Sequence, residues 1–132
     1  MAKFGVVLVS HSEYIAKGLK ELVDEMNDGS VQVVAAGGAD GGRIGTSAIK
    51  IQGAIESVED CDHILIYADL GSSILSAETA IDLIDEDLAE KVQLVDAPIV
   101  AGALAGVVQG TISDDVADVI KASEDARNVH KN

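Results

Sequence analysis

The sequence contains very few aromatic residues and a single cysteine. Tryptophan is absent from the 132 residues, phenylalanine occurs once and tyrosine twice. A flavin or a run of stacked nucleobases needs aromatic surfaces to rest against, so both classes of ligand are disfavoured. The lone cysteine, Cys61, excludes an internal disulfide and a cysteine-based metal site. We expect Cys61 to pack in the interior rather than to react.

Positive charge is also scarce. Nine Lys and Arg residues stand against 23 Asp and Glu residues, which gives a formal net charge of -14. This charge would repel nucleic-acid phosphates and anionic membrane surfaces, whereas a protein partner with a basic surface would be attracted. The only arginines are Arg43 and Arg127, so a basic clamp for the phosphates of a nucleoside triphosphate is missing as well.

Long hydrophobic runs are missing too. The longest stretch of apolar residues and glycine, 97–110, is shorter than the ~20 residues that a bilayer-spanning helix needs. Residues 1–3 lead directly into an apolar strand pattern and do not resemble a cleavable leader. Because 48% of the residues are hydrophobic, the chain can still bury one good core. We therefore expect a single domain over residues 1–132, located in the cytoplasm.

Short apolar segments alternate with amphipathic ones along the chain. Strands are predicted at 4–9, 31–36, 64–68 and 92–95, and the continuous apolar run of the first is typical of a strand buried on both faces. Apolar residues at three- and four-residue spacing predict helices between these strands and after the last one. The helix starts are expected to be capped by Ser12, by Thr46 or Ser47, and by Ser113 with the two aspartates that follow it, and Pro98 suits the first turn of a helix.

This alternation predicts an α/β fold with a mostly parallel sheet. Right-handed crossovers with helices on both faces give a doubly wound four-stranded sheet. With the strand order 2-1-3-4, the switch point lies between the first and third strands, and ligands bind beyond the carboxyl ends of those strands. Residues 10–12 and 69–73 occupy these ends. Since adjacent strands are about 4.8 Å apart, we expect His11 and Asp69 to be in contact.

His11 is the residue best placed for chemistry. A nucleophilic imidazole needs one nitrogen free and the other held by an acceptor, a role that suits Asp69. Backbone amides at two helix starts could hold the anionic oxygens of a phosphoryl group, together with the hydroxyls of Ser12, Ser72 and Ser73. A structural histidine that caps its helix is the alternative interpretation.

Other patterns add less. The glycine-rich segment 37–46 could bring backbone amides close to an anion, but it lacks a P-loop lysine and dinucleotide-binding spacing, so a surface loop explains it equally well. His63 opens the third strand at the end opposite the site, His130 lies in a polar tail, and no zinc motif or hydrolase elbow occurs. What remains is a site that could take a phosphoryl group from one protein and pass it to another.

Four segments together resemble a known family. They are Val9-Ser10-His11-Ser12, Ile44-Gly45-Thr46, the block from Asp69-Leu70-Gly71-Ser72-Ser73 to Ala77-Glu78-Thr79-Ala80, and 97–105. In order and spacing they are similar to DhaM, the phosphotransferase subunit of dihydroxyacetone kinases coupled to the phosphoenolpyruvate:sugar phosphotransferase system. The resemblance implies the α/β fold of a mannose-type EIIA domain and a homodimer.

The same resemblance implies a function. His11 would accept a phosphoryl group from the phosphocarrier HPr and pass it to ADP on the DhaL subunit, for phosphorylation of dihydroxyacetone on DhaK. ADP would belong to the partner, and this chain would bind no cofactor and no metal. Carried over by position, His11 is the phosphoacceptor and Asp69 orients its ring. The residues implied to line the phosphoryl site are Gly45, Thr46, Gly71, Ser72 and Ser73.

Three alternatives remain. A mannose-type EIIA domain of a sugar permease shares the histidine chemistry but not the block at 70–73. A receiver-type signalling domain phosphorylated on Asp69 needs paired acids after the first strand to hold magnesium, and Ser10 and His11 stand there instead. A flavodoxin-like binding module is opposed by the shortage of aromatic residues.

Overall fold

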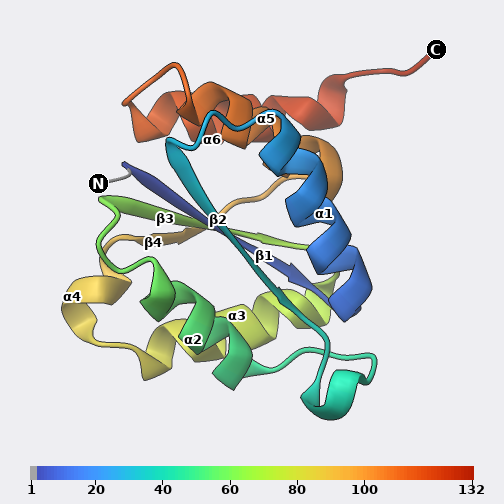
Figure 1. The fold of residues 1–132 in the computed structure, drawn as a ribbon, viewed down its shortest axis with the longest axis vertical. Helices are drawn as coiled ribbons and strands as arrows, with labels where there is room; N and C mark the ends of the chain where they lie inside the picture. Colours follow the sequence, from blue (N-terminus) through green and yellow to red (C-terminus); the bar gives the residue numbers. More distant parts are fainter. Residues whose placement is uncertain (1–2) are drawn as a thin grey trace.

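The computed structural model describes residues 3–132, in which strands alternate with helices (Figure 1). The strands are β1 (Phe4–Ser10), β2 (Val31–Gly37), β3 (His63–Ala68) and β4 (Val92–Leu94). The α-helices are α1 (Glu13–Glu25), α2 (Ala48–Ser57), α3 (Gly71–Leu83), α4 (Glu86–Ala89), α5 (Ile99–Gly110) and α6 (Val116–Asp125). Two 3-10 turns are η1 (Asp40–Gly42) and η2 (Ala126–Asn128).

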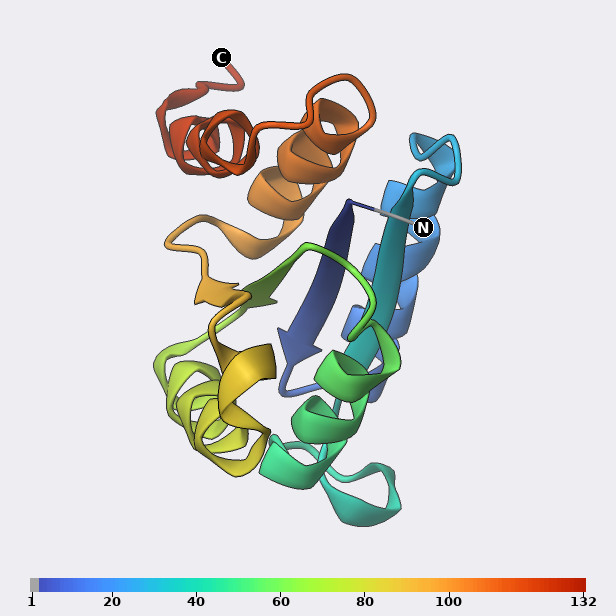
Figure 2. The same ribbon diagram turned by 90° about the vertical axis from the view of Figure 1, so that its left-hand side faces the viewer.

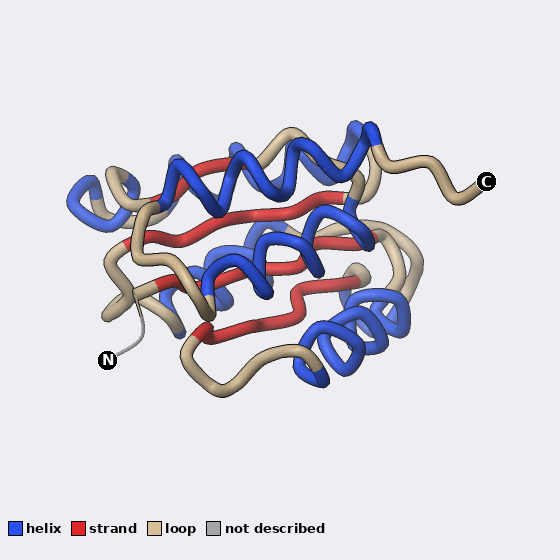
Figure 3. Tube along the Cα trace, turned by 90° about the horizontal axis from the view of Figure 1, so that it is seen from above, coloured by secondary structure: helices blue, strands red, loops and turns tan. Residues whose placement is uncertain are grey.

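The strands form one parallel sheet in the order β2-β1-β3-β4, and this confirms the predicted order. β1 pairs with β2 from Phe4 beside Val31 to Ser10 beside Gly37. Figure 3 shows the strands running side by side. Because parallel strands end at the same edge of a sheet, the residues that follow β1 and β3 are brought together there.

Helices cover both faces of this sheet, as Figures 1 and 2 show. The side chains of Val7 and Val9 pack on the face covered by α2, α3 and α4. Those of Val6 and Leu8 pack on the other face, against α1, α5 and α6. Alternating side chains of β1 therefore enter two cores, which explains why the strand is apolar throughout.

Polar side chains fix where three of the helices begin. Ser12 accepts a hydrogen bond from the amide of Ile15 at the start of α1. Ser47, rather than Thr46, caps α2, and Asp115 caps α6. A cap of this kind contributes about 1 kcal/mol to stability. The cap of α1 also sets the position of the residue before it, His11.

Some boundaries differ from the predicted ones. β4 ends at Leu94, although the amide of Val95 still donates to the carbonyl of Ile66. Pro98 lies just before α5 rather than in its first turn. Helix α4 was not predicted, because four residues are too few to show a helical period. None of the helices within residues 3–132 is long and apolar enough to cross a bilayer.

Candidate functional site

The carboxyl ends of β1 and β3 bring His11 and Asp69 into contact, as the sequence predicts. The ring nitrogen Nδ1 of His11 lies 3.0 Å from Oδ1 of Asp69. The backbone amide of His11 donates to Oδ2 of the same carboxylate, also at 3.0 Å. One carboxylate therefore holds both the main chain and the ring of the histidine.

The Asp69 carboxylate accepts further hydrogen bonds from its surroundings. Oδ2 accepts from the Ser10 hydroxyl at 2.9 Å, and Oδ1 accepts from the Leu70 amide at 2.8 Å and the Ser73 hydroxyl at 2.5 Å. Burial alone would raise the pKa of this carboxyl, but the hydrogen bonds from Ser73, His11 and Ser10 outweigh it and hold the pKa well below its ordinary value. Asp69 is therefore ionised, and Nδ1 of His11 carries the proton that faces it.

The second ring nitrogen of His11, Nε2, lies on the exposed side of the ring. With the proton on Nδ1, Nε2 keeps its lone pair, and the hydroxyl of Ser72 lies 2.5 Å from it. Ser73 is fully buried, and its hydroxyl lies 3.0 Å from Nδ1. Consecutive serines at the start of α3 thus contact opposite nitrogens of one ring. The side chain of His11 is 22% exposed, so a reactant can reach Nε2 from solvent.

The predicted phosphoryl-site residues Gly45 and Thr46 lie beside His11, but their polar groups are already engaged. The Gly45 amide donates to the His11 carbonyl at 2.8 Å. Gly45 has a φ of +140°, and a Cβ built on it would lie 3.3 Å from Ala39, so this position favours glycine. The Thr46 hydroxyl lies 2.6 Å from that of Ser76 on α3. Both contacts fasten the glycine-rich loop to the site.

The other predicted residues stand at helix starts. The hydroxyl of Ser12 is used as the cap of α1. Gly71 is the first residue of α3, and a Cβ built on it would meet nothing within 4 Å. The first turn of α3 therefore presents the Gly71 and Ser72 backbone beside the exposed side of the His11 ring. A helix start of this kind attracts anionic oxygens.

Ser10 is the site residue that the sequence reasoning missed. It is fully buried, donates to Asp69, and accepts a hydrogen bond from the amide of Ser12 at 3.1 Å. Its hydroxyl thus joins the carboxylate to the start of α1. The sequence feature that could have pointed to Ser10 is its place at the end of an otherwise apolar strand, immediately before His11.

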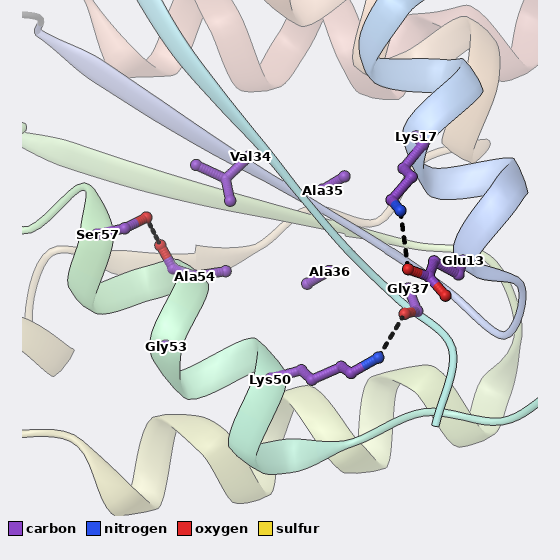
Figure 4. A pocket seen from close by; sticks show the side chains of 10 residues that line it. All are labelled: Glu13, Lys17, Val34, Ala35, Ala36, Gly37, Lys50, Gly53, Ala54 and Ser57. Atoms are coloured by element: carbon purple, nitrogen blue, oxygen red, sulfur yellow. Dashed lines mark hydrogen bonds and ion pairs between the residues drawn. The ribbon is translucent and has the colours of Figure 1, made fainter. Parts of the chain in front are cut away.

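A groove of about 380 Å³ lies beside the edge strand β2 (Figure 4). Both lysines that line it are occupied by hydrogen bonds. Lys17 donates to Glu13 at 2.8 Å, and Lys50 donates to the carbonyls of Gly37 and Ala39 at 3.4 and 3.3 Å. Lys50 therefore holds the end of β2 and the start of the glycine-rich loop, which contacts His11 further on through Gly45.

Cys61, His63 and His130 are the residues that the sequence predicts to be unreactive, and their surroundings are as follows. Cys61 is buried, and this burial raises the pKa of its thiol. His63 stacks on Phe4, with ring centroids 5.9 Å apart, at the opposite end of the sheet. His130 is exposed in the tail. Within residues 3–132, no cluster of three His, Cys, Asp or Glu side chains could hold a metal ion.

Known proteins are similar to this chain in sequence and in fold. Residues 5–120 match the EIIA-man family, described as the PTS system fructose IIA component. The chain belongs to this family. An EIIA-man relative from Listeria innocua is the phosphoryl donor subunit DhaM of PEP-dependent dihydroxyacetone kinase 2. It is 41% identical, over 95% of this chain and 98% of its own length.

A second relative is much longer than this chain, and a solved structure matches it over nearly its whole length. The DhaM subunit of the Klebsiella michiganensis PEP-dependent dihydroxyacetone kinase is 48% identical over 93% of this chain, which spans 26% of that protein. The crystal structure of EF1359, a protein of unknown function, matches with a TM-score of 0.86 and 35% identity, over 98% of this chain and 97% of that one. The predicted resemblance to DhaM and the predicted mannose-type EIIA fold are confirmed.

Proposed function

We propose that this chain is the phosphoryl donor subunit of a PEP-dependent dihydroxyacetone kinase and carries the phosphoryl group on Nε2 of His11. The observation that carries the proposal is the orientation of the ring. An ionised Asp69 holds Nδ1, and Nε2 is directed to solvent with its lone pair. The names of the DhaM relatives support the same role.

Phosphorylation begins with phospho-HPr as the donor. The lone pair of Nε2 attacks phosphorus in line, the bond between phosphorus and the donor nitrogen breaks, and its electron pair returns to the donor ring. Positive charge develops on the ring of His11 as the new bond forms. Asp69 stabilises this charge at 3.0 Å from Nδ1, in the way that a buried carboxylate stabilises an imidazolium in other enzymes.

The start of α3 then holds the transferred group. The Ser72 hydroxyl rotates away from Nε2 to admit phosphorus and donates to a phosphoryl oxygen instead. The amides of Gly71 and Ser72 supply further donors at the helix start. In the next step the oxygen of ADP on DhaL attacks the same phosphorus, and the electrons of the nitrogen–phosphorus bond return to Nε2. DhaL retains the nucleotide, and DhaK holds the dihydroxyacetone that is finally phosphorylated.

A labelling experiment tests this function. The chain is incubated with labelled phosphoenolpyruvate, enzyme I and HPr, and the labelled peptide is mapped. We expect acid-labile, base-stable label on the His11 peptide, and loss of that label when DhaL–ADP is added. His11→Ala should take up no label, whereas His130→Ala, which changes an exposed histidine in the tail, should be labelled normally.

The alternatives give different results. Label that stays on His11 until a sugar permease is supplied would identify a mannose-type EIIA domain of a transporter, which shares the fold and the histidine. Absence of label on the wild-type chain would return His11 to a structural role and overturn the proposal.

A further inference from the structure

Two buried serines hold the carboxylate of Asp69, one at each oxygen. Within residues 3–132 only three polar side chains are buried, those of Ser10, Ser73 and Ser123. Ser10 donates to Oδ2 of Asp69 at 2.9 Å, and Ser73 donates to Oδ1 at 2.5 Å. A hydroxyl is buried only where it finds a hydrogen-bond partner, so the placing of two of the three at one carboxylate indicates a shared task there.

The hydroxyl of Ser73 also contacts the ring of His11. Its oxygen lies 3.0 Å from Nδ1, and Nδ1 lies 3.0 Å from Oδ1 of Asp69. A hydroxyl has one proton and two lone pairs, so a Ser73 hydroxyl that donates to Asp69 can only accept from Nδ1. One serine therefore fixes the carboxylate and the ring at the same time.

Ser73 has no polar group left for a phosphoryl oxygen. Its hydroxyl is committed to Asp69 and His11, and its backbone amide donates to the carbonyl of Leu70 at 3.0 Å. Its side chain is fully buried on the Nδ1 side of the ring, whereas Nε2 faces away from that side. The resemblance to the DhaM family implies that Ser73 lines the phosphoryl site, but these contacts favour a different role.

The neighbouring serine has the opposite surroundings. Ser72 is exposed, and its hydroxyl lies 2.5 Å from Nε2. Consecutive residues of an α-helix point in directions about 100° apart, so Ser72 and Ser73 reach different sides of the ring from one helix turn. Only Ser72 is placed to contact a phosphoryl group on Nε2.

Resting on the proposed function, we propose that Ser73 is a positioning residue for phosphoryl transfer, which holds Asp69 against Nδ1 of His11 and does not contact the phosphoryl group. Positive charge reaches Nδ1 when Nε2 bonds to phosphorus, and the Nδ1 proton then has two acceptors instead of one. The carboxylate, held by Ser10 and Ser73, cannot rotate away from the ring. Nε2 therefore keeps one orientation while the group arrives and leaves.

Two matched alanine variants test this role. Ser73→Ala and Ser123→Ala each remove a fully buried hydroxyl, and that of Ser123 bonds to Tyr67 and to the carbonyl of Gly102. We expect both variants to unfold at lower urea concentration, but only Ser73→Ala to lower kcat for phosphorylation by phospho-HPr, about ten-fold with KM unchanged. Phosphoramidate, a small phosphoryl donor, should show the same ten-fold loss, because the defect lies in the ring. Ser73→Cys, which keeps the volume but donates weakly, gives the same test if Ser73→Ala does not fold.

A double variant shows through which group Ser73 acts. If Ser73 works by holding Asp69, Ser73→Ala should change the rate less than two-fold in the Asp69→Asn chain. Ser72→Ala removes the hydroxyl beside Nε2 and should cost the same factor in either chain. The ¹⁵N chemical shifts of the His11 ring give a second measurement: the wild type should carry its proton on Nδ1, and Ser73→Ala should show a mixture of both tautomers.

The outcomes separate this role from the proposed function. A wild-type kcat and a single tautomer in Ser73→Ala, or equal losses of kcat in Ser73→Ala and Ser123→Ala, would overturn the positioning role and leave the proposed function intact. A full ten-fold loss from Ser73→Ala in the Asp69→Asn chain would overturn it as well, since Ser73 would then act on the phosphoryl group itself. A wild-type chain that takes no label on His11 would overturn both.

Discussion

Asp69 decides which nitrogen of His11 can react. Its carboxylate faces Nδ1 and is itself held in place by the His11 amide, so the ring cannot turn over without losing the contact between Nδ1 and Oδ1. Because the carboxylate is ionised, the proton of the neutral ring stays on Nδ1. The nucleophilic lone pair is thereby fixed on Nε2.

Replacing Asp69 by asparagine should slow the reaction without unfolding the chain. An amide cannot supply the negative charge that stabilises the developing positive ring. We expect Asp69→Asn to accept the phosphoryl group about 10 to 100 times more slowly, measured by rapid quench with phospho-HPr. A wild-type rate would make Asp69 a purely structural residue.

The lowered pKa of Asp69 also predicts how stability depends on pH. A carboxyl whose pKa is lower in the folded chain stabilises the fold above its unfolded pKa of about 4, and this stabilisation is lost as the pH falls through its folded pKa. The wild type should therefore exceed Asp69→Asn in free energy of unfolding most at neutral pH, and the difference should shrink below about pH 4. Urea unfolding at several pH values measures it. A difference independent of pH would contradict an ionised Asp69.

Ser10 should matter for both stability and transfer. Ser10→Ala removes a hydrogen bond to Asp69 and leaves the amide of Ser12 without its side-chain acceptor. We expect a loss of about 1 to 2 kcal/mol in the free energy of unfolding, together with slower phosphorylation. Ser57→Ala removes a hydroxyl that bonds only within α2 and serves as the control, with normal phosphorylation. Equal phosphorylation rates for the two variants would separate Ser10 from the site.

The contact between His11 and Asp69 could be predicted from the sequence, but its full surroundings could not. His11 and Asp69 could be placed because each directly follows an apolar strand, and the two strands neighbour each other. Ser72 and Ser73 were both expected at the site, yet only the geometry of α3 puts one on Nε2 and the other on Nδ1. Ser10 was missed because a buried serine at a strand end looks like any residue that begins a turn.

The junction between β2 and α1 depends on the absence of a side chain. A Cβ built on Gly37 would lie 2.6 Å from the carbonyl oxygen of Ser12 and 2.7 Å from the Cβ of Ala16. We expect Gly37→Ala to push the start of α1 away from the sheet and to cost about 1 to 3 kcal/mol in stability. Chemical denaturation gives the stability, and the phosphorylation rate reports whether His11 has moved.

At a second glycine, Gly53, there is room for a side chain. Gly53 lies within α2, where a Cβ would meet nothing within 4 Å. Gly53→Ala should therefore raise the free energy of unfolding by about 0.5 to 1 kcal/mol, because alanine loses less backbone entropy in a helix. If both alanine variants changed stability in the same direction, the close contact at Gly37 would not be the cause.

The longer elements could be predicted, whereas among the shortest ones β4 was predicted one residue too long and α4 was not predicted. The seven residues of β1 are buried on both faces, so their composition is unambiguous. The three-residue strand β4 ends at Leu94, although the amide of Val95 still makes one further hydrogen bond to β3. Such a boundary depends on pairing with β3, which no local pattern records.

Across the whole molecule, charge is unevenly placed. A hollow far from His11 is lined by six acidic residues, namely Glu56, Glu59, Asp60, Asp85, Glu86 and Asp87. The sequence suggested that the net charge of -14 would attract a protein partner with a basic surface. The acids of α4 lie near the start of β3 and His11 lies near its end, so the length of this strand, about 20 Å, separates them and exceeds the Debye length of about 8 Å. We expect the double variant Glu86→Gln, Asp87→Asn, with a net charge of -12, to keep the wild-type phosphorylation rate within about two-fold. Stopped-flow kinetics at physiological ionic strength measures it. A markedly slower variant would restore long-range attraction as the means of docking.

The pairing of Nδ1 with Asp69 also fixes the proton balance of the relay. Nδ1 holds its proton and Asp69 its negative charge both before phosphorus bonds to Nε2 and afterwards. In the proposed relay the Nδ1 proton therefore stays in place while the phosphoryl group passes through Nε2, so no step has to break and remake the hydrogen bond to Asp69.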